Sequence, residues 1–255
     1  MGLLEGKKAL ILGVANERSI AWAIAQNLKK NGARVALSYL NDALKKRVEP
    51  LSQEVEADFI FEMDVTNDDH YELVKEKVEK EWGKFDILIH SLAFANKDDM
   101  KADFSDTSRA GFAMACDISA FSLIGLCHHL KDLMHDNSSV ISMTYHGSVK
   151  VMDGYKVMGV AKAALEASNR YLAVDLGNRG IRCNCISAGP IKTLAASGVP
   201  GLRKVFDLVD EKSPLHKNVS QDDVGQTAVY LASDMSKSVT GQILYVDSGM
   251  SIMAF

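Results

Sequence analysis

Short runs of apolar residues alternate along the chain with longer stretches in which apolar residues recur every three or four positions. Residues 8–13, KALILG, form a continuous apolar run that ends in glycine, which is typical of a parallel strand buried on both faces. The longer stretches have the period of helices that bury one face. The pattern predicts helices over about 111–135 and 155–177, and strands at 8–13, 34–39, 59–63, 86–91, 139–144, 181–187 and 242–247.

The regular order of strand, helix and strand favours one α/β domain over residues 1–255. No segment repeats, and no stretch rich in proline or glycine separates two parts of the chain. We therefore expect a single Rossmann-like doubly wound domain with a mostly parallel sheet of about seven strands. Ligands of such folds bind at the carboxyl ends of the strands. The residues at the predicted strand exits are Gly13, Leu40, Asp64, Leu92, Tyr145 and Ile191.

Composition and charge narrow the classes of partner. The chain has 255 residues, of which 47% are hydrophobic, and a formal net charge of −4. It has no basic run, so we expect neither a nucleic-acid partner nor binding to an anionic membrane. No apolar stretch approaches the ~20 residues of a transmembrane helix, and residues 1–7 lack a signal-peptide pattern.

The cysteines favour a reducing compartment, and we expect the protein in the cytoplasm. Four cysteines are too few and too irregularly spaced for a disulfide framework, and no second ligand pair has the spacing of a metal site. They are Cys116, Cys127, Cys183 and Cys185.

The main candidate chemistry lies in the helix predicted after the fifth strand. Tyr155 and Lys162 are seven residues apart, so they share one helix face at roughly 10 Å along the axis. Asp153 is a candidate N-cap of this helix. A phenol near an ammonium group is a proton donor whose phenolate form is stabilised. On this segment alone, a surface lysine and a core tyrosine that share a face by chance remain the alternative interpretation.

The turn after the first strand has part of the pattern of a dinucleotide site. The G-x-G-x-x-G fingerprint is absent, and Gly13 alone keeps the tight turn. Ser19 stands where a glycine usually approaches the pyrophosphate, at the start of a helix whose free N–H groups attract phosphate. Asp64, after the third strand, is either an acceptor for the adenine amine or part of a helix N-cap.

The segment after the second strand bears on the choice of cofactor. Leu40-Asn41-Asp42 offers neither the usual acidic partner of a ribose 2′-hydroxyl nor a cation for a 2′-phosphate. Lys45 and Lys46 are near in sequence, and we expect them on the next helix, facing solvent.

Four segments together resemble one branch of the short-chain dehydrogenase/reductase family. Most members carry a tyrosine four residues before the active-site lysine, whereas Met158 stands there in this chain and Tyr155 lies seven before it. A second tyrosine, Tyr145, lies ten residues upstream. With the Gly-x5-Ser-Ile turn at 13–20, Ser-Leu-Ala-Phe-Ala at 91–95 and the loop 188–198, this spacing is similar to that of the bacterial NADH-dependent enoyl-acyl-carrier-protein reductases.

The resemblance implies a complete set of site residues, with Tyr155, Tyr145 and Lys162 as the catalytic ones. NADH, rather than NADPH, would contact Gly13, Ser19, Ile20, Leu40, Asp64, Val65, Leu92, Lys162, Ile191, Lys192, Thr193, Leu194 and Ala195. An enoyl thioester on acyl carrier protein would contact Ala95, Tyr145, Tyr155, Met158, Ala196 and Leu202. An apolar lid at about 193–212 would cover the acyl chain, and the resemblance also implies a homotetramer that acts in bacterial fatty-acid elongation.

Other interpretations stay open at this point. The same fold serves carbonyl and hydroxysteroid-type dehydrogenases, and some members bind a dinucleotide only as sensors. Silent members usually lack the tyrosine or the lysine, and this chain has Tyr145, Tyr155 and Lys162. The stretch 194–212 is also consistent with a plain amphipathic surface helix.

Overall fold

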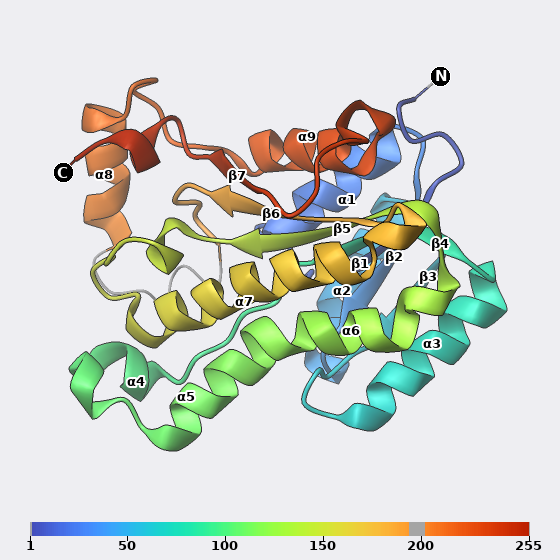
Figure 1. Ribbon diagram of the computed structural model, residues 1–255, viewed down its shortest axis with the longest axis horizontal. Coiled ribbons are helices and arrows are strands. Elements are labelled where there is room, and N and C mark those ends of the chain that lie inside the picture. The colour runs from blue at the N-terminus through green and yellow to red at the C-terminus, as the bar shows by residue number, and fades with distance from the viewer. Residues whose placement is uncertain (1, 194–201, 255) are drawn as a thin grey trace.

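A computed structural model describes residues 2–193 and 202–254 of the chain. In this part of the molecule seven strands form one sheet in the order β3-β2-β1-β4-β5-β6-β7, and all neighbours are parallel (Figure 1). The predicted α/β class, doubly wound order and number of strands are therefore confirmed. The strands are β1 (Lys8–Leu12), β2 (Arg34–Tyr39), β3 (Phe59–Glu62), β4 (Phe85–His90), β5 (Met134–Thr144), β6 (Arg182–Ala188) and β7 (Ile243–Val246).

Helices cover both faces of the sheet because successive side chains of its strands point to opposite faces. Ala9 and Ile11 of β1 belong to one buried cluster, whereas Leu10 and Leu12 belong to the other. The first cluster includes residues of α1 (Ile20–Lys30), α2 (Asp42–Glu54) and α9 (Gln221–Ala232), and the second includes residues of α3 (Asp68–Trp82), α6 (Ser122–Leu130) and α7 (Lys156–Asp175). The helices α4 (Lys97–Lys101) and α8 (Leu202–Lys212) lie at the left of Figure 1, beyond the carboxyl ends of the strands.

The first and the last long helices, α1 and α9, pack directly against each other. A Cβ on Gly225 would lie 2.4 Å from Asn27 Nδ2 and 2.9 Å from the Ala23 carbonyl oxygen, so only glycine permits this approach. Asn27 Nδ2 donates to Asp222 Oδ1 at 2.9 Å, across 195 residues of sequence.

The predicted helix over 111–135 is observed, but it is not regular throughout. It consists of α5 (Arg109–Cys116), a π-helical segment at Asp117–Phe121, and α6. Ser122 Oγ donates to the Ile118 carbonyl oxygen at 2.6 Å, and His90 Nε2 lies 2.8 Å from Ser122 Oγ. Because the Ser122 hydroxyl already donates, His90 Nε2 must carry the proton that joins β4 to this segment.

The expectation that no apolar stretch approaches the length of a transmembrane helix was wrong. Within the described residues, the continuous helix Arg109–Leu133 is long and apolar enough to cross a membrane by length and composition. Half of its most apolar window is buried inside the fold, where α6 side chains pack against the sheet.

The start of the predicted active-site helix also differs from expectation. The residue before α7 is Tyr155, which takes the N-cap position, so the assignment of Asp153 as N-cap was wrong. The helix ends at Asp175, and Gly180, with φ of +69°, closes the short 3₁₀ turn that follows.

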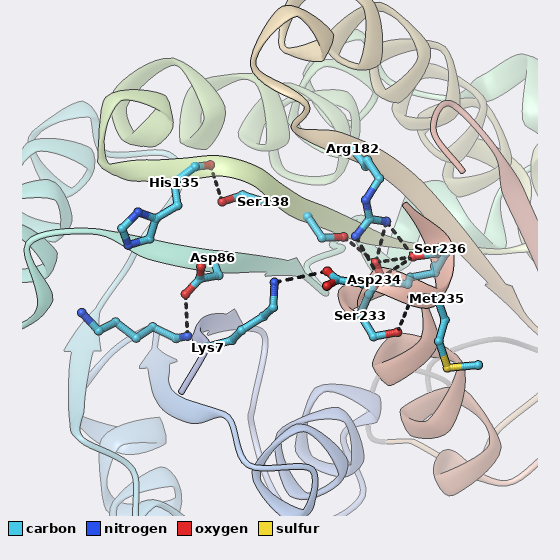
Figure 2. Close-up of polar contacts among 12 residues, drawn as sticks. Lys7, Asp86, His135, Ser138, Arg182, Ser233, Asp234, Met235 and Ser236 are labelled. Carbon is cyan, nitrogen blue, oxygen red and sulfur yellow. Dashed lines mark hydrogen bonds and ion pairs between the residues drawn. The ribbon is translucent and has the colours of Figure 1, made fainter. Parts of the chain in front are cut away.

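The amino ends of the strands are fastened by a separate polar network, which Figure 2 shows. Arg182, the first residue of β6, donates to the Leu231 carbonyl oxygen and to Ser236 Oγ, both at 2.7 Å. Lys7 forms an ion pair of 3.7 Å with Asp234. This network secures the end of α9 at the amino ends of the strands, whereas the candidate site lies at their carboxyl ends.

Candidate active site

Two tyrosines meet in a ring-to-ring contact beyond β5. Tyr145 directly follows β5 and Tyr155 caps α7, and their ring centroids lie 4.7 Å apart at an interplanar angle of 64°. Gly147 lies beneath both rings, because a Cβ there would be 2.4 Å from Tyr155 Cδ1 and 3.3 Å from Tyr145 Cδ1. A Cβ on Gly159 would lie 2.6 Å from the Gly147 carbonyl oxygen. These glycines allow the loop after β5 to pack on α7 and fix the pair of rings.

Both phenols are available as neutral proton donors. Among the described residues, neither the Tyr145 nor the Tyr155 hydroxyl takes part in any hydrogen bond with the protein. Burial raises the pKa of Tyr145 to about 12. Burial, followed by the nearby Tyr145 and Glu166, raises the pKa of Tyr155 further above its usual value. Each hydroxyl therefore keeps its proton at neutral pH.

Lys162 is buried, with 4% of its surface exposed, and its ammonium group is held by main-chain oxygens. Nζ donates to the Met143 carbonyl oxygen at 2.8 Å and to the Leu92 carbonyl oxygen at 3.4 Å. Burial lowers its pKa to about 8, although Cys185 and Glu166 act in the opposite direction. An ammonium group has three donors, so one N–H remains for a ligand.

The ammonium group of Lys162 does not reach back to Tyr155. In the part of the chain that the structure describes, no hydrogen bond joins the two side chains. The prediction that the two side chains share a face of one helix placed Tyr155 within the helix, whereas Tyr155 is the N-cap of α7 and precedes a residue with φ of +40°. Two carbonyl oxygens at the ends of β4 and β5 hold the lysine.

The first strand exit is shaped for a phosphate group. Gly13 has φ of +102°, and a Cβ there would lie 2.1 Å from the Ser91 carbonyl oxygen, so this position requires glycine. Ser19 Oγ accepts from the N–H groups of Ala15 at 3.0 Å and Asn16 at 3.1 Å, which leaves its own proton free to donate. The described residues provide no acceptor for the N–H of Ile20, the first residue of α1. These donors at a helix N-terminus fit a pyrophosphate.

At the second strand exit, the segment Leu40-Asn41-Asp42 itself holds no cation for a 2′-phosphate. Leu40 is 44% exposed, and Asn41 accepts from the Leu44 N–H, so its side chain caps α2. Lys45 does reach back toward this exit, because its Nζ lies 5.6 Å from the centroid of the ring of Tyr39, the last residue of β2. The expectation that Lys45 faces solvent was therefore wrong.

At the third strand exit, Asp64 organises its own turn. Its Oδ1 accepts from Thr66 N at 3.0 Å and from Thr66 Oγ1 at 2.7 Å, while Asn67 caps α3. The interpretation of Asp64 as an N-cap was therefore wrong. Val65, the next residue, is buried and accepts a hydrogen bond of 2.9 Å from Tyr71 Oη.

An apolar cluster lies beside the two tyrosines and contains three predicted substrate residues. Met158 is buried in it, and Ala95 and Tyr155 pack against it. Its remaining members come from α4, α5 and α7, namely Met100, Ala115, Val157 and Ala161, with Cys116 at the edge. Ser119, from the π-helical segment, accepts from the Phe94 N–H at 3.2 Å and so fixes the loop that carries Ala95. The structure thus brings an apolar wall next to two phenol groups.

The comparisons with known proteins agree with this arrangement. The family described as Enoyl-(Acyl carrier protein) reductase matches residues 13–251. The chain belongs to this family. The enoyl-acyl-carrier-protein reductase (NADH) 1 of Rhizobium meliloti is 51% identical over 97% of this chain and 91% of the relative.

Solved structures of the same family superpose on nearly the whole chain. A Bacillus cereus enoyl-acyl carrier protein reductase, in complex with NADP+ and indole naphthyridinone, has a TM-score of 0.98 at 44% identity and full coverage of both chains. The Anaplasma phagocytophilum reductase with NAD has a TM-score of 0.96 at 40% identity, covering 100% of this chain and 97% of that one. The resemblance to the enoyl reductase branch is therefore confirmed.

The loop after β6 of this enoyl reductase family member is described in part. Ile191 is buried in the core, and Lys192 Nζ lies 5.2 Å from the centroid of the Phe206 ring of α8. The Thr193 N–H donates to the Ile191 carbonyl oxygen at 2.8 Å. Leu194, Ala195 and Ala196 lie outside the described residues, as does the side chain of Leu202, the first residue of α8.

Sequence reasoning missed several polar residues of this reductase fold. Glu166 is buried on α7 and accepts from Thr144 Oγ1 at 2.6 Å. His90 has no exposed surface, and burial together with Lys162 lowers its pKa to about 3, so it is neutral. Lys156, next to Tyr155, binds main-chain oxygens of another segment. No spacing in the sequence signals these contacts, because each depends on a partner distant along the chain.

Proposed function

We propose that this protein reduces the trans-2 double bond of enoyl thioesters carried on acyl carrier protein, with NADH, in bacterial type II fatty-acid biosynthesis. The observation that carries the proposal is the position of Tyr155. It stands at the start of α7, seven residues before Lys162, and its hydroxyl is free beside an apolar wall. Met158 occupies the place of the usual tyrosine and is buried in that wall.

The displacement of the tyrosine fits an enoyl substrate better than a ketone. In ketone reduction the charge develops on an oxygen bonded to the carbon that is reduced. In enoyl reduction it develops on the thioester oxygen, two carbons away from C3. Tyr155 is the N-cap, three residues before Met158. Three residues along a regular helix correspond to about 4.5 Å, the scale of this extra distance. The Tyr155 hydroxyl would donate a hydrogen bond to the thioester oxygen as charge develops.

Tyr145 is the second candidate for contact with the same oxygen. Its ring lies against that of Tyr155, and its raised pKa also keeps it a donor. We rank Tyr155 first because α7 also positions Lys162, whereas Tyr145 follows β5.

NADH, when bound, would supply the hydride. The residues that would hold it are Gly13 and Ser19 with the N-terminus of α1 at the pyrophosphate, and Lys162 at the nicotinamide ribose. Because the Met143 and Leu92 carbonyl oxygens take two of the Lys162 donors, the third would point to a ribose hydroxyl. No cation stands within Leu40-Asn41-Asp42, which supports NADH over NADPH, although Lys45 Nζ lies over the ring of the preceding Tyr39.

The proposal extends to assembly and compartment. We expect a cytoplasmic homotetramer. Supporting observations are the free cysteines and several exposed apolar side chains on α5, the π-helical segment, α6 and α7, namely Phe112, Met114, Phe121, Ile124 and Val174. Light scattering after gel filtration tests this expectation, and a monomer at micromolar concentration would contradict it.

The decisive experiment compares Tyr155→Phe with Tyr145→Phe, using crotonyl and acetoacetyl thioesters and following the loss of NADH absorbance. The parent should reduce the crotonyl substrate and have little or no activity on the keto substrate. Tyr155→Phe should lower kcat/KM about ten-fold or more, or about 1.4 kcal/mol, and more than Tyr145→Phe. Tyr171→Phe, on an exposed part of α7, is the matched control. A parent that prefers the keto substrate, or a fully active Tyr155→Phe variant, would refute the proposal.

A further inference from the structure

The first residue of α7 has a backbone conformation that its side chain does not favour. Lys156 has φ of +40°, in the left-handed region where residues other than glycine, asparagine and aspartate are uncommon. It directly follows Tyr155, whose ring position depends on how this helix begins. Such a conformation persists where the surrounding contacts determine it.

The contacts that hold Lys156 come from a different segment. Its Nζ donates to the Lys101 carbonyl oxygen at 2.9 Å and also to the carbonyl oxygen of Ala102. These are the last residue and the C-cap of α4. A lysine ammonium group is a suitable donor for the unpaired carbonyl oxygens at the end of a helix.

The segment that Lys156 holds forms part of the apolar wall. Met100 of α4 is 7% exposed and belongs to the same cluster as Met158 and Tyr155. On its other side α4 is fastened by Asp99, which is 6% exposed and accepts from the Ser108 N–H at 2.7 Å. Asp99 thus ties α4 to the start of α5, and Lys156 ties it to the start of α7.

We propose that Lys156 is a positioning residue that fixes α4 against the start of α7 and so sets the wall for the acyl chain beyond C4 of the substrate. This inference rests on the proposed enoyl reduction and adds to it a determinant of chain-length preference. Lys156 does not touch the reacting atoms. Its two hydrogen bonds keep Met100 in place against Met158, so that a long acyl chain meets an ordered surface.

Three substitutions separate this role from backbone strain. Lys156→Met removes the donor and keeps the strain, whereas Lys156→Gly removes the donor and relieves the strain. Lys156→Arg keeps a donor at the same position. Lys150→Met, in the exposed loop before α7, is the control for the loss of one positive charge near the site.

The first measurement is kcat/KM for crotonyl and dodecenoyl thioesters. In both Lys156→Met and Lys156→Gly the ratio of dodecenoyl to crotonyl activity should fall about five-fold, mainly through KM, because the ordered wall contributes to binding. Lys156→Arg should restore most of the ratio, and Lys150→Met should leave it unchanged. The melting temperatures of the Met and Gly variants should differ, because only the Gly variant relieves the strain.

The second measurement is amide hydrogen exchange of residues 97–103 in the protein without substrate, which does not depend on activity. Exchange there should be faster in the Met and Gly variants than in the parent and in Lys150→Met. Unchanged exchange, or an unchanged substrate ratio in an active protein, would overturn the positioning role. A parent without enoyl reduction would instead overturn the proposed function, and the exchange result would still report on the Lys156 contacts.

Discussion

Replacing Gly147 by alanine should damage catalysis through the position of Tyr155. The added Cβ would lie 2.4 Å from Tyr155 Cδ1 and 2.9 Å from Cε1, whereas ordinary contact begins near 3.4 Å. The Tyr155 ring therefore has to move by about 1 Å, the scale of misplacement that can cost ~100-fold in rate. It has little room to do so, because the Tyr145 ring lies 4.7 Å away between centroids.

The expected result is a fall of roughly 10- to 100-fold in kcat with crotonyl thioester. Overpacking should also lower the free energy of unfolding by about 1–3 kcal/mol, which thermal unfolding measures. Gly177→Ala is the matched control, since nothing lies within 4 Å of a Cβ at that exposed position after the same helix. A Gly147→Ala variant with the parent's kcat and melting temperature would refute the packing argument.

The remaining predictions concern Lys162, the adenosine side and the π-helical segment. Folding lowers the pKa of Lys162 from 10.5 to about 8, so its buried charge destabilises the fold most below about pH 8. The free energy of unfolding of the parent, relative to Lys162→Met, should therefore rise by up to about 3 kcal/mol between about pH 8 and 10.5. A difference in unfolding free energy that does not change with pH would contradict this. Enzymatic activity should be largely lost in Lys162→Met. NADPH should give a lower kcat/KM than NADH, and Asp42→Arg should reduce this difference in kcat/KM. Comparable kcat/KM values for the two cofactors in the parent would contradict the reasoning. Ser122→Ala leaves the buried His90 Nε2–H unpaired, so it should lower the melting temperature and raise KM for the crotonyl thioester. An unchanged melting temperature and KM would show that the Ser122 hydroxyl has no role in fixing the π-helical segment.

The sequence was sufficient to predict those strands and helices whose pattern lies in residues next to one another along the chain. The central strands β1 and β4 are buried on both faces and consist mainly of apolar residues, so their positions could be predicted within a few residues. An exception among the strands was β5, which begins at Met134, five residues before the predicted start. Polar residues at Asp136, Asn137 and Ser138 hide this part of the strand, where its pairing with β4 shifts register.

The side-chain contacts of the site were less predictable, because they depend on main-chain groups far away in sequence. Lys162 binds the Leu92 carbonyl oxygen across 70 residues, and Lys156 binds that of Lys101 across 55. Spacing along one helix predicted that Tyr155 and Lys162 share a face, but it carried no information on these acceptors or on the place of Tyr155 as the N-cap. The positive φ of Lys156 has no sequence signature either, because lysine is not a residue that favours it.

The contact between α1 and α9 has a consequence for how the chain is made. The side of α1 that carries Ile24 and Leu28 is synthesised first, yet Val224 and Ala228 of α9, which share its buried cluster, follow 200 residues later. At ~5–20 residues per second, the ribosome takes roughly 10–40 s to cover that interval. During this time the apolar side of α1 has no α9 to cover it, so the nascent chain is exposed to aggregation or chaperone capture until its last fifth has emerged. Premature stops after β6 should therefore yield insoluble fragments rather than a smaller folded protein.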